Sequence, residues 1–463
     1  MNNIALSQIA QWVKGQLQGQ GEVTPEINQI STDTRKLQAG DLFFALAGEN
    51  FDAHDFVAQG KADSAAAVVV QRPVKAACPR IMVADTRLAL GDLAREYRRQ
   101  FKGKLFGITG SNGKTTVKEM LASICQTQGE TLATVGNLNN DIGLPLTLFN
   151  LDNQAYGVIE MGANHHGEIS YLTNIAKPDV AVITHAGSAH LEGFGDIPGV
   201  ARAKGEIYEG LGAEGIAIIN ADDPNNAVWF ENAKPRKILT FGLHHDADFS
   251  AEWKASENGN QLKLKARIDG HEQPVIDISM QLYGVHNVMN ALAAAAAASA
   301  AGIDLSGVRQ GLENMRPVKG RLQWNQGPAG MRVLDDTYNA NPTSLSAGLA
   351  VLATVPGEHW LILGDMGELG EKSEEMHEEA GRLARRAGVS RMLTFGDMSR
   401  YGSEYFGEGG EHFTDQQALL NAVEQEWKGE GAVLVKGSRA MQMERFVDAL
   451  KQQAAEQVAK GEH

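Results

Sequence analysis

Short apolar runs alternate with amphipathic segments along most of this 463-residue chain. Apolar runs bounded by Gly, Pro, Asn or Asp are typical of buried strands, and apolar positions spaced three and four apart are typical of helices. The pattern predicts short strands at 41–44, 67–70 and 81–83, followed by a charged amphipathic helix at 88–100. We expect these residues to form a small α/β unit.

The middle of the chain shows a regular strand–helix alternation. Apolar strands are predicted at 105–109, 156–160, 180–184, 215–220 and 237–240, with helical segments between them. This order is typical of a parallel sheet covered on both faces by helices. Residues 261–268 alternate polar and apolar after a turn, which indicates an antiparallel hairpin with one solvated face. The alanine-rich segment at 287–301 predicts a helix that packs closely on its neighbours.

The last part repeats the alternation. Strands are predicted at 331–335, 360–363, 391–394 and 433–435, and helices at 344–352, 373–388 and 417–427. It contains no Gly-x-Gly-x-x-Gly motif, so a dinucleotide role is not supported there. The expected fold is therefore α/β with three domains. Residues 1–84 form a small N-terminal α/β domain, 85–314 a central phosphate-loop domain with an antiparallel hairpin region, and 315–463 a Rossmann-like doubly wound sheet.

Composition limits the classes of partner. The formal net charge of −15 argues against nucleic acid or an anionic membrane as the main partner. Cys78 and Cys125 are the two cysteines, and their wide spacing argues against a disulfide framework or a zinc site. The first residues do not resemble a signal peptide, and the alanine-rich run is too short to span a bilayer. We expect a cytoplasmic, soluble, monomeric protein that binds small molecules.

The chemistry begins at Thr109-Gly-Ser-Asn-Gly-Lys-Thr-Thr116, between a predicted strand and a predicted helix. A glycine loop that opens a helix directs backbone N–H groups at phosphates. Lys114 is expected to reach the β- and γ-phosphates, and the Thr115 hydroxyl suits Mg²⁺. Ile108 stands where the full phosphate-loop pattern has its first glycine, so this is a shortened variant. The predicted nucleotide-binding residues are Gly110, Ser111, Asn112, Gly113, Lys114, Thr115 and Thr116.

Three further residues lie where such a site needs partners. Glu160 ends an apolar strand and is a candidate magnesium ligand, although an acidic residue can also simply close a strand. His190 lies in a glycine-rich stretch after another strand; it is either structural or a ligand, and Mg²⁺ ordinarily prefers oxygen. Lys204 lies near the start of a predicted helix, and composition alone gives it only the role of a solvated surface charge.

Amides and carboxylates gather at several loops. Asn287 and Asn290 at a helix start either read an adenine edge or cap the helix. The runs at 136–145, 335–342 and 364–370 are rich in Asn, Asp and Gly; they are either plain turns or ligand loops at strand ends. No guanine-type Asn-Lys-x-Asp signature is present, so ATP is favoured over GTP.

Together these motifs resemble the Mur ligases, the ATP-dependent amide-forming enzymes of peptidoglycan assembly. The shortened phosphate loop, Asn220-Ala-Asp-Asp-Pro224 and His286-Asn-Val-Met-Asn-Ala-Leu292 are similar to family motifs. Three stretches look like the family members that add D-alanyl-D-alanine to UDP-N-acetylmuramoyl-tripeptide: 137–145, 335–342 and 363–370. The resemblance covers essentially the whole chain.

The resemblance implies roles for individual residues. Lys114 and Thr115 match residues that hold ATP phosphates and magnesium, while Glu160 and His190 match magnesium ligands. Lys204 matches a lysine that family members carry as a carbamate, an anion that supports a second Mg²⁺. The matches at the adenine and ribose are Asn287, Asn290, Arg321 and Asp336.

The substrate side is implied in the same way. In the first segment, 31–35 and 48–54 look like the uridine-diphosphate end of the site, which assigns Ser31, Asp33 and Arg35. Asn339 and Asn341 resemble the dipeptide side of the cleft. The remaining expected substrate-binding residues are Asn137, Asn139, Asn140 and Asp141.

The implied reaction activates the tripeptide carboxylate with ATP as an acyl phosphate, which the dipeptide amine then attacks. Mg²⁺, Lys114 and the loop amides would offset the repulsion between the two anions. Two alternatives stay open within the superfamily: the ligase that adds the third muramoyl-peptide residue, and folylpolyglutamate synthetase. A phosphate-loop kinase or transporter ATPase is an alternative of another class, and a non-enzymatic nucleotide-binding module is a third.

Overall fold

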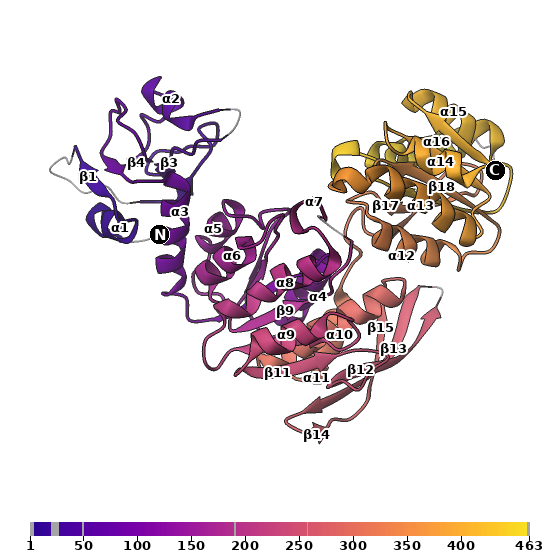
Figure 1. The fold of residues 1–463 in the computed structure, drawn as a ribbon, viewed down its shortest axis with the longest axis horizontal. Coiled ribbons are helices and arrows are strands. Elements are labelled where there is room, and N and C mark those ends of the chain that lie inside the picture. Colours follow the sequence, from indigo (N-terminus) through magenta and orange to yellow (C-terminus); the bar gives the residue numbers. More distant parts are fainter. Residues whose placement is uncertain (1–3, 20–26, 49–50, 189–190, 257, 461–463) are drawn as a thin grey trace.

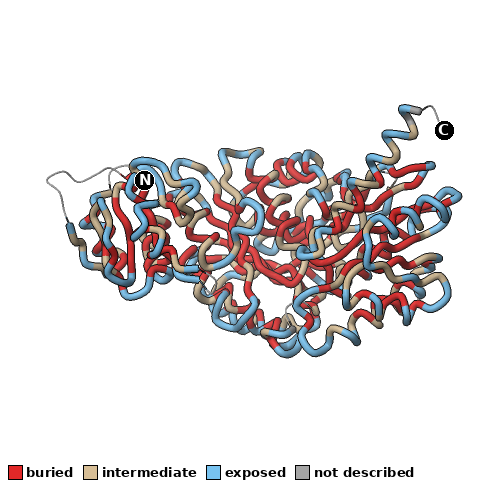
Figure 2. Tube along the Cα trace, turned by 90° about the horizontal axis from the view of Figure 1, so that it is seen from above, coloured by how far each residue is buried: buried red, intermediate tan, exposed pale blue. Residues whose placement is uncertain are grey.

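The computed structural model describes residues 4–19, 27–48, 51–188, 191–256 and 258–460. It contains three separate β-sheets that follow one another along the chain, and the central part of the molecule lies between the other two (Figure 1). Buried chain runs through the interior of each part, with exposed segments outside it (Figure 2). No helix in the described part of the chain combines the length and the apolar character needed to cross a bilayer.

The N-terminal sheet has the strand order β1-β5-β4-β3-β2, and only β1 is antiparallel to its neighbour. Its strands are β1 (Gln16–Gln18), β2 (Ile30–Ser31), β3 (Leu42–Phe44), β4 (Ala67–Val70) and β5 (Arg80–Met82). Its helices are α1 (Leu6–Trp12), α2 (Ala53–Ala58) and α3 (Thr86–Arg98). Leu90 and Leu93 of α3 pack into this unit, whereas Ala94 packs into the next, so α3 joins the two cores.

The central sheet has the order β14-β13-β12-β11-β10-β9-β6-β8-β7, with β15 paired to β13. Strands β6 to β12 run parallel, and β13 turns back antiparallel to β12. The strands are β6 (Lys104–Thr109), β7 (Thr131–Ala133), β8 (Tyr156–Glu160), β9 (Val180–Ile183), β10 (Ile216–Asn220), β11 (Lys237–Phe241), β12 (Phe249–Ser256), β13 (Gly259–Ile268), β14 (His271–Glu272) and β15 (Ile276–Met280).

Helices cover both faces of this sheet because each presents an apolar stripe to it. One face carries α4 (Lys114–Gln126), α10 (Val285–Ala300) and α11 (Leu305–Asn314). The other face carries α5 (Gly143–Leu148), α6 (Glu168–Ala176), α8 (Ile197–Gly205), η1 (Glu206–Gly210) and α9 (Asn226–Ala233); the short α7 (Leu191–Phe194) precedes α8. The alanines at 291–298 are buried, and their small side chains let α10 lie close to α4 and the sheet.

The C-terminal sheet has the order β16-β17-β21-β18-β19-β20, and only β16 is antiparallel. Its strands are β16 (Gln323–Gln326), β17 (Arg332–Asp336), β18 (Glu358–Gly364), β19 (Arg391–Phe395), β20 (Gly410–Phe413) and β21 (Gly431–Lys436). Helices α12 (Pro342–Leu352), α13 (Ser373–Arg386) and α14 (Arg400–Phe406) share one apolar core, while α15 (Gln416–Glu426) and α16 (Glu444–Lys460) share the other. Single turns η2 (Gly370–Lys372) and η3 (Arg439–Met441) lie in its loops.

The structure confirms the expected fold class of three α/β units, with a parallel central sheet, an antiparallel hairpin region and a doubly wound last sheet. The predicted strands and helices reappear within one or two residues of their expected ends. Most of the strands not predicted, such as β7 and β20, are short and lie at sheet edges; the exception is β12, the eight-residue partner of the hairpin strand β13, which lies inside the sheet. The domain boundaries at 84/85 and 314/315 fall between the sheets and stay a prediction.

Candidate active site

A cavity of about 610 Å³ lies where the central and C-terminal parts face one another. Its walls come from the phosphate loop, the loop after β7, the ends of β8 and β9, the start of α10, and the loop after β17. Parallel strands place their carboxyl ends at one sheet edge, which is where open α/β sheets bind ligands. Sixteen of the expected site residues line this cavity: Ser111, Asn112, Gly113, Lys114, Thr115, Thr116, Asn137, Asn139, Asn140, Glu160, Asn287, Asn290, Arg321, Asp336, Asn339 and Asn341.

The phosphate loop joins β6 to α4 through two glycines with positive φ, Gly110 at 148° and Gly113 at 83°. A Cβ at Gly110 would lie 1.8 Å from the Thr184 hydroxyl, and one at Gly113 would lie 2.5 Å from the Asn290 side chain. Both positions therefore need glycine for conformation and for space. The Lys114 ammonium donates to the carbonyl of Gly110 at 2.6 Å, and burial lowers its pKa.

The carboxylate of Glu160 lies directly beside this loop. It accepts from the Thr115 hydroxyl at 3.0 Å and from the Asn139 amide at 2.8 Å. Its own backbone N–H donates to the Thr134 hydroxyl at 3.0 Å, which fixes the end of β8 against β7. A buried hydroxyl and a carboxylate at the mouth of a phosphate loop form an oxygen donor set of the kind that Mg²⁺ prefers.

Lys204 is fully buried, contrary to the solvated role that composition gave it. Its ammonium donates to the carbonyl of Ala163 at 3.4 Å and lies 5.0 Å from the centre of the Phe194 ring. Burial, and after it the nearby Lys114 charge, lowers the pKa of Lys204 to about 7. A lysine with this pKa is about half uncharged near neutral pH, and the uncharged amine is the form that reacts with CO₂.

His190 lies outside the described residues, so its predicted ligand role stays a prediction. Within the described ranges, no three His, Cys, Asp or Glu side chains cluster in a way that would hold a metal ion by themselves. The described donors beside the phosphate loop are Thr115 and Glu160, and Lys204 would join them only once it carries a carboxylate.

The predicted adenine and ribose residues all line the cavity. Asn287 donates to the Tyr283 carbonyl at 2.8 Å and accepts from the Asn290 amide at 3.1 Å, so the two amides hold each other across one helical turn. Arg321 stacks 4.3 Å above the Tyr338 ring and reaches the Thr115 hydroxyl at 3.3 Å. That last contact joins the C-terminal part to the phosphate-loop helix.

Lys436 is a site residue that the sequence gave no reason to select. It lies at the end of β21, opposite Asp336 in the register with β17, and it is 1% exposed. Its ammonium pairs with the Asp336 carboxylate and donates to the Asn339 carbonyl at 2.9 Å. It therefore links the predicted ribose carboxylate to the predicted dipeptide loop.

One of the predicted dipeptide residues, Asn341, contacts the phosphate loop directly. The Asn341 amide N–H donates to the Asn112 side-chain carbonyl at 2.8 Å, and the Asn112 amide N–H donates to the Asn341 side-chain carbonyl at 3.4 Å. Asn341 also caps α12 by accepting from the Ser344 N–H at 2.8 Å. One amide thus serves both as a helix cap and as a contact between the two parts of the molecule.

Two histidines with no predicted role also line the cavity: His185, two residues after β9, and His286, at the start of α10. Burial lowers the pKa of both imidazoles to about 4, so both are neutral at pH 7.

The loop at 364–370 has a structural role through Asp365, whose carboxylate accepts hydrogen bonds from three successive backbone N–H groups at 397–399. Its carboxylate is therefore occupied in holding the start of α14.

The expected uridine-diphosphate residues lie at the carboxyl edge of the N-terminal sheet, apart from the cavity. Ser31 ends β2, and the Arg35 guanidinium donates two hydrogen bonds, of 2.8 and 2.9 Å, to the Asp33 carboxylate. This pairing lowers the pKa of Asp33 to about 2. Asp141 lies between the two regions, where it pairs with Arg87 of α3 at 3.0 Å.

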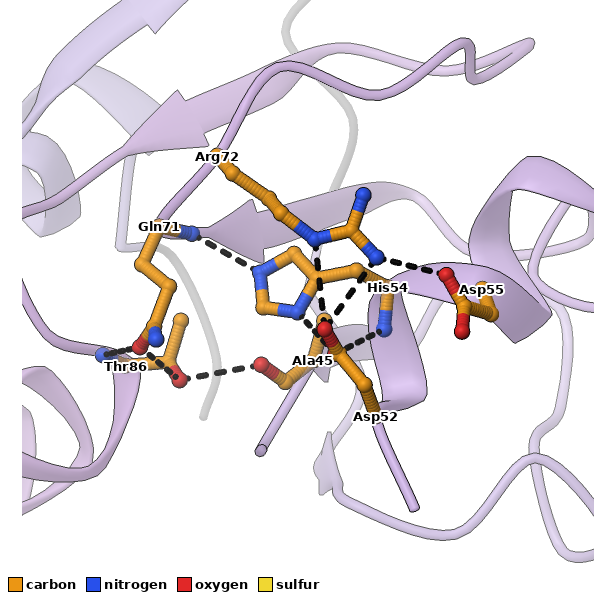
Figure 3. Close-up of polar contacts among 7 residues, drawn as sticks. All are labelled: Ala45, Asp52, His54, Asp55, Gln71, Arg72 and Thr86. Carbon is orange, nitrogen blue, oxygen red and sulfur yellow. Dashed lines mark hydrogen bonds and ion pairs between the residues drawn. The ribbon is translucent and has the colours of Figure 1, made fainter. Parts of the chain in front are cut away.

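A polar network orders the same edge beside these residues (Figure 3). The buried His54 ring contacts Asp52 at 2.5 Å through Nδ1 and accepts from the Gln71 N–H at 2.9 Å through Nε2. Arg72 donates to Asp52 from the opposite side. The network fixes the described part of the 48–54 segment against the end of β4; residues 49 and 50 lie outside the described residues.

Three family models match the chain in order. They are the "Mur ligase family, catalytic domain" over residues 26–98, the "Mur ligase middle domain" over 108–298, and the "Mur ligase, glutamate ligase domain" over 320–439. The chain is 43% identical to the UDP-N-acetylmuramoyl-tripeptide--D-alanyl-D-alanine ligase of Escherichia coli (strain K12), covering 98% of this chain and 99% of that one. It is 35% identical to the protein of the same name from Bacillus subtilis (strain 168), covering 96% and 97%.

Solved structures agree with these matches. A crystal structure of MurF from Acinetobacter baumannii superimposes with a TM-score of 0.90 at 38% identity, covering 97% of this chain and 98% of that one. MurF from Thermotoga maritima in complex with ADP superimposes with a TM-score of 0.82 at 29% identity, covering 93% and 98%.

Proposed function

The chain belongs to the Mur ligase family, and we propose on this basis that it joins D-alanyl-D-alanine to UDP-N-acetylmuramoyl-tripeptide at the expense of ATP. The products are UDP-N-acetylmuramoyl-pentapeptide, ADP and phosphate, and the enzyme is a C–N ligase of peptidoglycan precursor synthesis. The observation that carries the substrate assignment is the 43% identity, over 98% of this chain, to the Escherichia coli ligase of that name.

The reaction has to overcome the low reactivity of a carboxylate toward an amine. The tripeptide carboxylate attacks the γ-phosphorus of ATP, which gives an acyl phosphate and ADP. The neutral amine of the dipeptide then attacks the acyl carbon, the C–N bond forms, and phosphate leaves through a tetrahedral intermediate. Both reactants of the first step are anions, so their approach needs positive groups fixed beforehand.

The phosphate loop supplies those groups. Backbone N–H groups of the loop and the start of α4 face the triphosphate, and Lys114 reaches its outer phosphates. Asn287, Asn290, Arg321 and Asp336 bind the adenine and ribose, with Lys436 holding Asp336 in place. Asn339 and Asn341 orient the dipeptide from the C-terminal side.

The uridine diphosphate binds at the N-terminal sheet, through Ser31, Asp33 and Arg35. Asn137, Asn139, Asn140 and Asp141 then guide the peptide toward the cavity. Because an acyl phosphate hydrolyses in open water, the central and C-terminal parts have to enclose it. The Asn112–Asn341 contact supports such an enclosed arrangement.

The donor set beside the loop fits magnesium, because it consists of a hydroxyl and a carboxylate, Thr115 and Glu160, 3.0 Å apart. When bound, Mg²⁺ would neutralise phosphate charge and orient the carboxylate. We assign Thr115, Glu160 and His190 as its ligands, and Lys204 as a fourth once it is carbamylated. The low pKa of Lys204 supports this, because the uncharged amine adds to CO₂ and loses a proton to give the carbamate anion.

The same proposal covers the organisation of the chain. Residues 1–84 bind the uridine diphosphate, 85–314 bind ATP, and 315–463 bind the dipeptide and close over the site. We propose that the enzyme acts as a monomer. We place the enzyme in the cytoplasm, where ATP is available.

Phosphate release tests the substrate assignment. The purified protein is given ATP, Mg²⁺ and each UDP-muramoyl peptide in turn, with D-alanyl-D-alanine, diaminopimelate or glutamate as the amine. We expect release only when UDP-N-acetylmuramoyl-tripeptide and D-alanyl-D-alanine are both present. Phosphate release with another UDP-muramoyl peptide and diaminopimelate, or with glutamate as the amine, would assign the chain to another branch of the superfamily.

A further inference from the structure

Lys118 is a buried lysine that the proposed reaction does not use. It lies on α4 three residues after Thr115, and it is only 2% exposed. Removing an ammonium group from water is costly unless it gains polar partners. Lys118 has two: its Nζ donates to the Thr134 carbonyl at 2.7 Å and pairs with the Glu119 carboxylate at 2.5 Å.

Thr134 directly follows β7 and is still hydrogen-bonded to β8. Its N–H donates to the Val158 carbonyl at 3.0 Å, and its hydroxyl accepts from the Glu160 N–H at 3.0 Å. With Lys118 on its carbonyl, all three polar groups of this buried residue are engaged. The next residue, Val135, is 71% exposed, so Thr134 is the buried anchor from which the exposed loop begins.

The loop that follows carries three asparagines that line the cavity, Asn137, Asn139 and Asn140. Its far end is also anchored: Asn139 accepts from the Gly162 N–H at 2.9 Å and donates to Glu160 at 2.8 Å. Asn140 accepts from the Gly143 N–H at 2.8 Å, at the start of α5. The loop is therefore held between two fixed points, one of which is the Lys118 bond.

We propose that Lys118 is a positioning residue that ties the nucleotide-binding helix to the 134–140 loop and thereby sets that loop for the UDP-linked peptide. The inference rests on the proposed function for the identity of this substrate. Thr115 and Lys118 share one face of α4, so the helix that holds the nucleotide also fixes the position of the 134–140 loop. Lys118 acts on the substrate through Thr134 and not by contact.

The test compares two variants that each lose a donor to a carbonyl from the same helix. Lys118→Met keeps the length of the side chain and removes its bond to the loop. Ser123→Ala is the matched control, because Ser123 donates to the Gly311 carbonyl at 2.7 Å, on α11 and away from the loop. The full chain is assayed for kcat and for the KM of each substrate, and amide hydrogen exchange is followed over 135–141.

We expect Lys118→Met to raise the KM for UDP-N-acetylmuramoyl-tripeptide by about five- to tenfold, the effect of one lost hydrogen bond in a buried setting. The KM for ATP should stay within about twofold, and exchange at 135–141 should rise while the rest of α4 stays protected. Ser123→Ala should change neither the tripeptide KM nor the loop exchange. Lys118→Arg, which keeps a cationic donor, should recover part of the protection.

An unchanged tripeptide KM and unchanged loop exchange in Lys118→Met would overturn the inference. If that variant does not fold, exchange in the wild-type protein decides: the amides of Leu138 and Asn139 should be protected, since each donates within the loop. Exchange there as fast as in an unstructured peptide would overturn it. Because exchange does not depend on turnover, an inactive wild-type protein would refute the proposed function and leave Lys118 to be judged by exchange alone.

Discussion

The contact between Asn112 and Asn341 gives the sharpest test of how the C-terminal part meets the phosphate loop. Asn341→Ser removes the amide that donates to Asn112 but keeps a side-chain oxygen that can cap α12. Asn112→Ala removes the other partner. The two bonds, of 2.8 and 3.4 Å, are worth about 1–2 kcal/mol together, because neutral hydrogen bonds contribute about 1 kcal/mol net and the second is long.

A double-mutant cycle isolates that contact from the direct role of Asn341 at the dipeptide. We expect each single variant to lower kcat/KM for D-alanyl-D-alanine by about tenfold, and the double variant to lose little more than Asn341→Ser alone. The thermal midpoint of Asn341→Ser should stay close to wild type. Asn341→Ala, which also loses the cap, should fall by a few degrees, since a cap contributes about 1 kcal/mol.

A loss in the double variant equal to the product of the two single losses would contradict a functional contact between the two amides. That outcome would mean a coupling energy near zero, and the two amides would then act on separate steps. A large fall in the thermal midpoint of Asn341→Ser would show that the serine does not cap α12. The comparison of Asn341→Ser with Asn341→Ala would then no longer separate the cap from the contact with Asn112.

Other predictions follow from the same site. Lys114→Ala should abolish turnover while circular dichroism and the thermal midpoint stay near wild type; near-normal phosphate release would remove Lys114 from the ATP site. Lys204→Ala should be inactive and partly restored by added short carboxylic acids, whereas full activity without any additive would rule out a carbamate. In CO₂-free buffer, the unfolded chain binds the Lys204 proton between about pH 7 and 10.5 and the folded chain does not, so the free energy of unfolding should rise with pH there by up to about 1.4 kcal/mol per unit. Lys204→Met should remove that slope, and an unchanged slope would show that the buried amine is not its source. Gly110→Ala should abolish ATP binding, measured by calorimetry, because its Cβ would lie 1.8 Å from Thr184; normal affinity would mean that the loop can shift.

The fold and the core of the site could be predicted because local pattern determines both. Glu160 follows an apolar strand and Lys114 follows a glycine loop, and neighbouring parallel strands have to end at the same edge. β7 was missed because it is a three-residue edge strand with little apolar signal. The antiparallel hairpin was predicted from its period-two alternation, which only a half-exposed strand produces.

The remaining site residues depend on contacts between distant parts of the chain. Lys436 meets Asp336 only because β21 pairs with β17 in one register, 100 residues apart. Asn112 and Asn341 are 229 residues apart. Lys204 appeared to be a surface charge because composition gives no measure of burial, and its low pKa follows from that burial.

In the proposed mechanism, ATP activates the tripeptide carboxylate and the dipeptide amine displaces the phosphate. The most direct measurement uses UDP-N-acetylmuramoyl-tripeptide labelled with ¹⁸O in the reacting carboxylate, with mass analysis of the released phosphate after complete turnover. Attack of a carboxylate oxygen on the γ-phosphorus transfers that oxygen, so each phosphate should carry one labelled atom and the new amide the other. Unlabelled phosphate, released together with the pentapeptide, would contradict the acyl-phosphate mechanism.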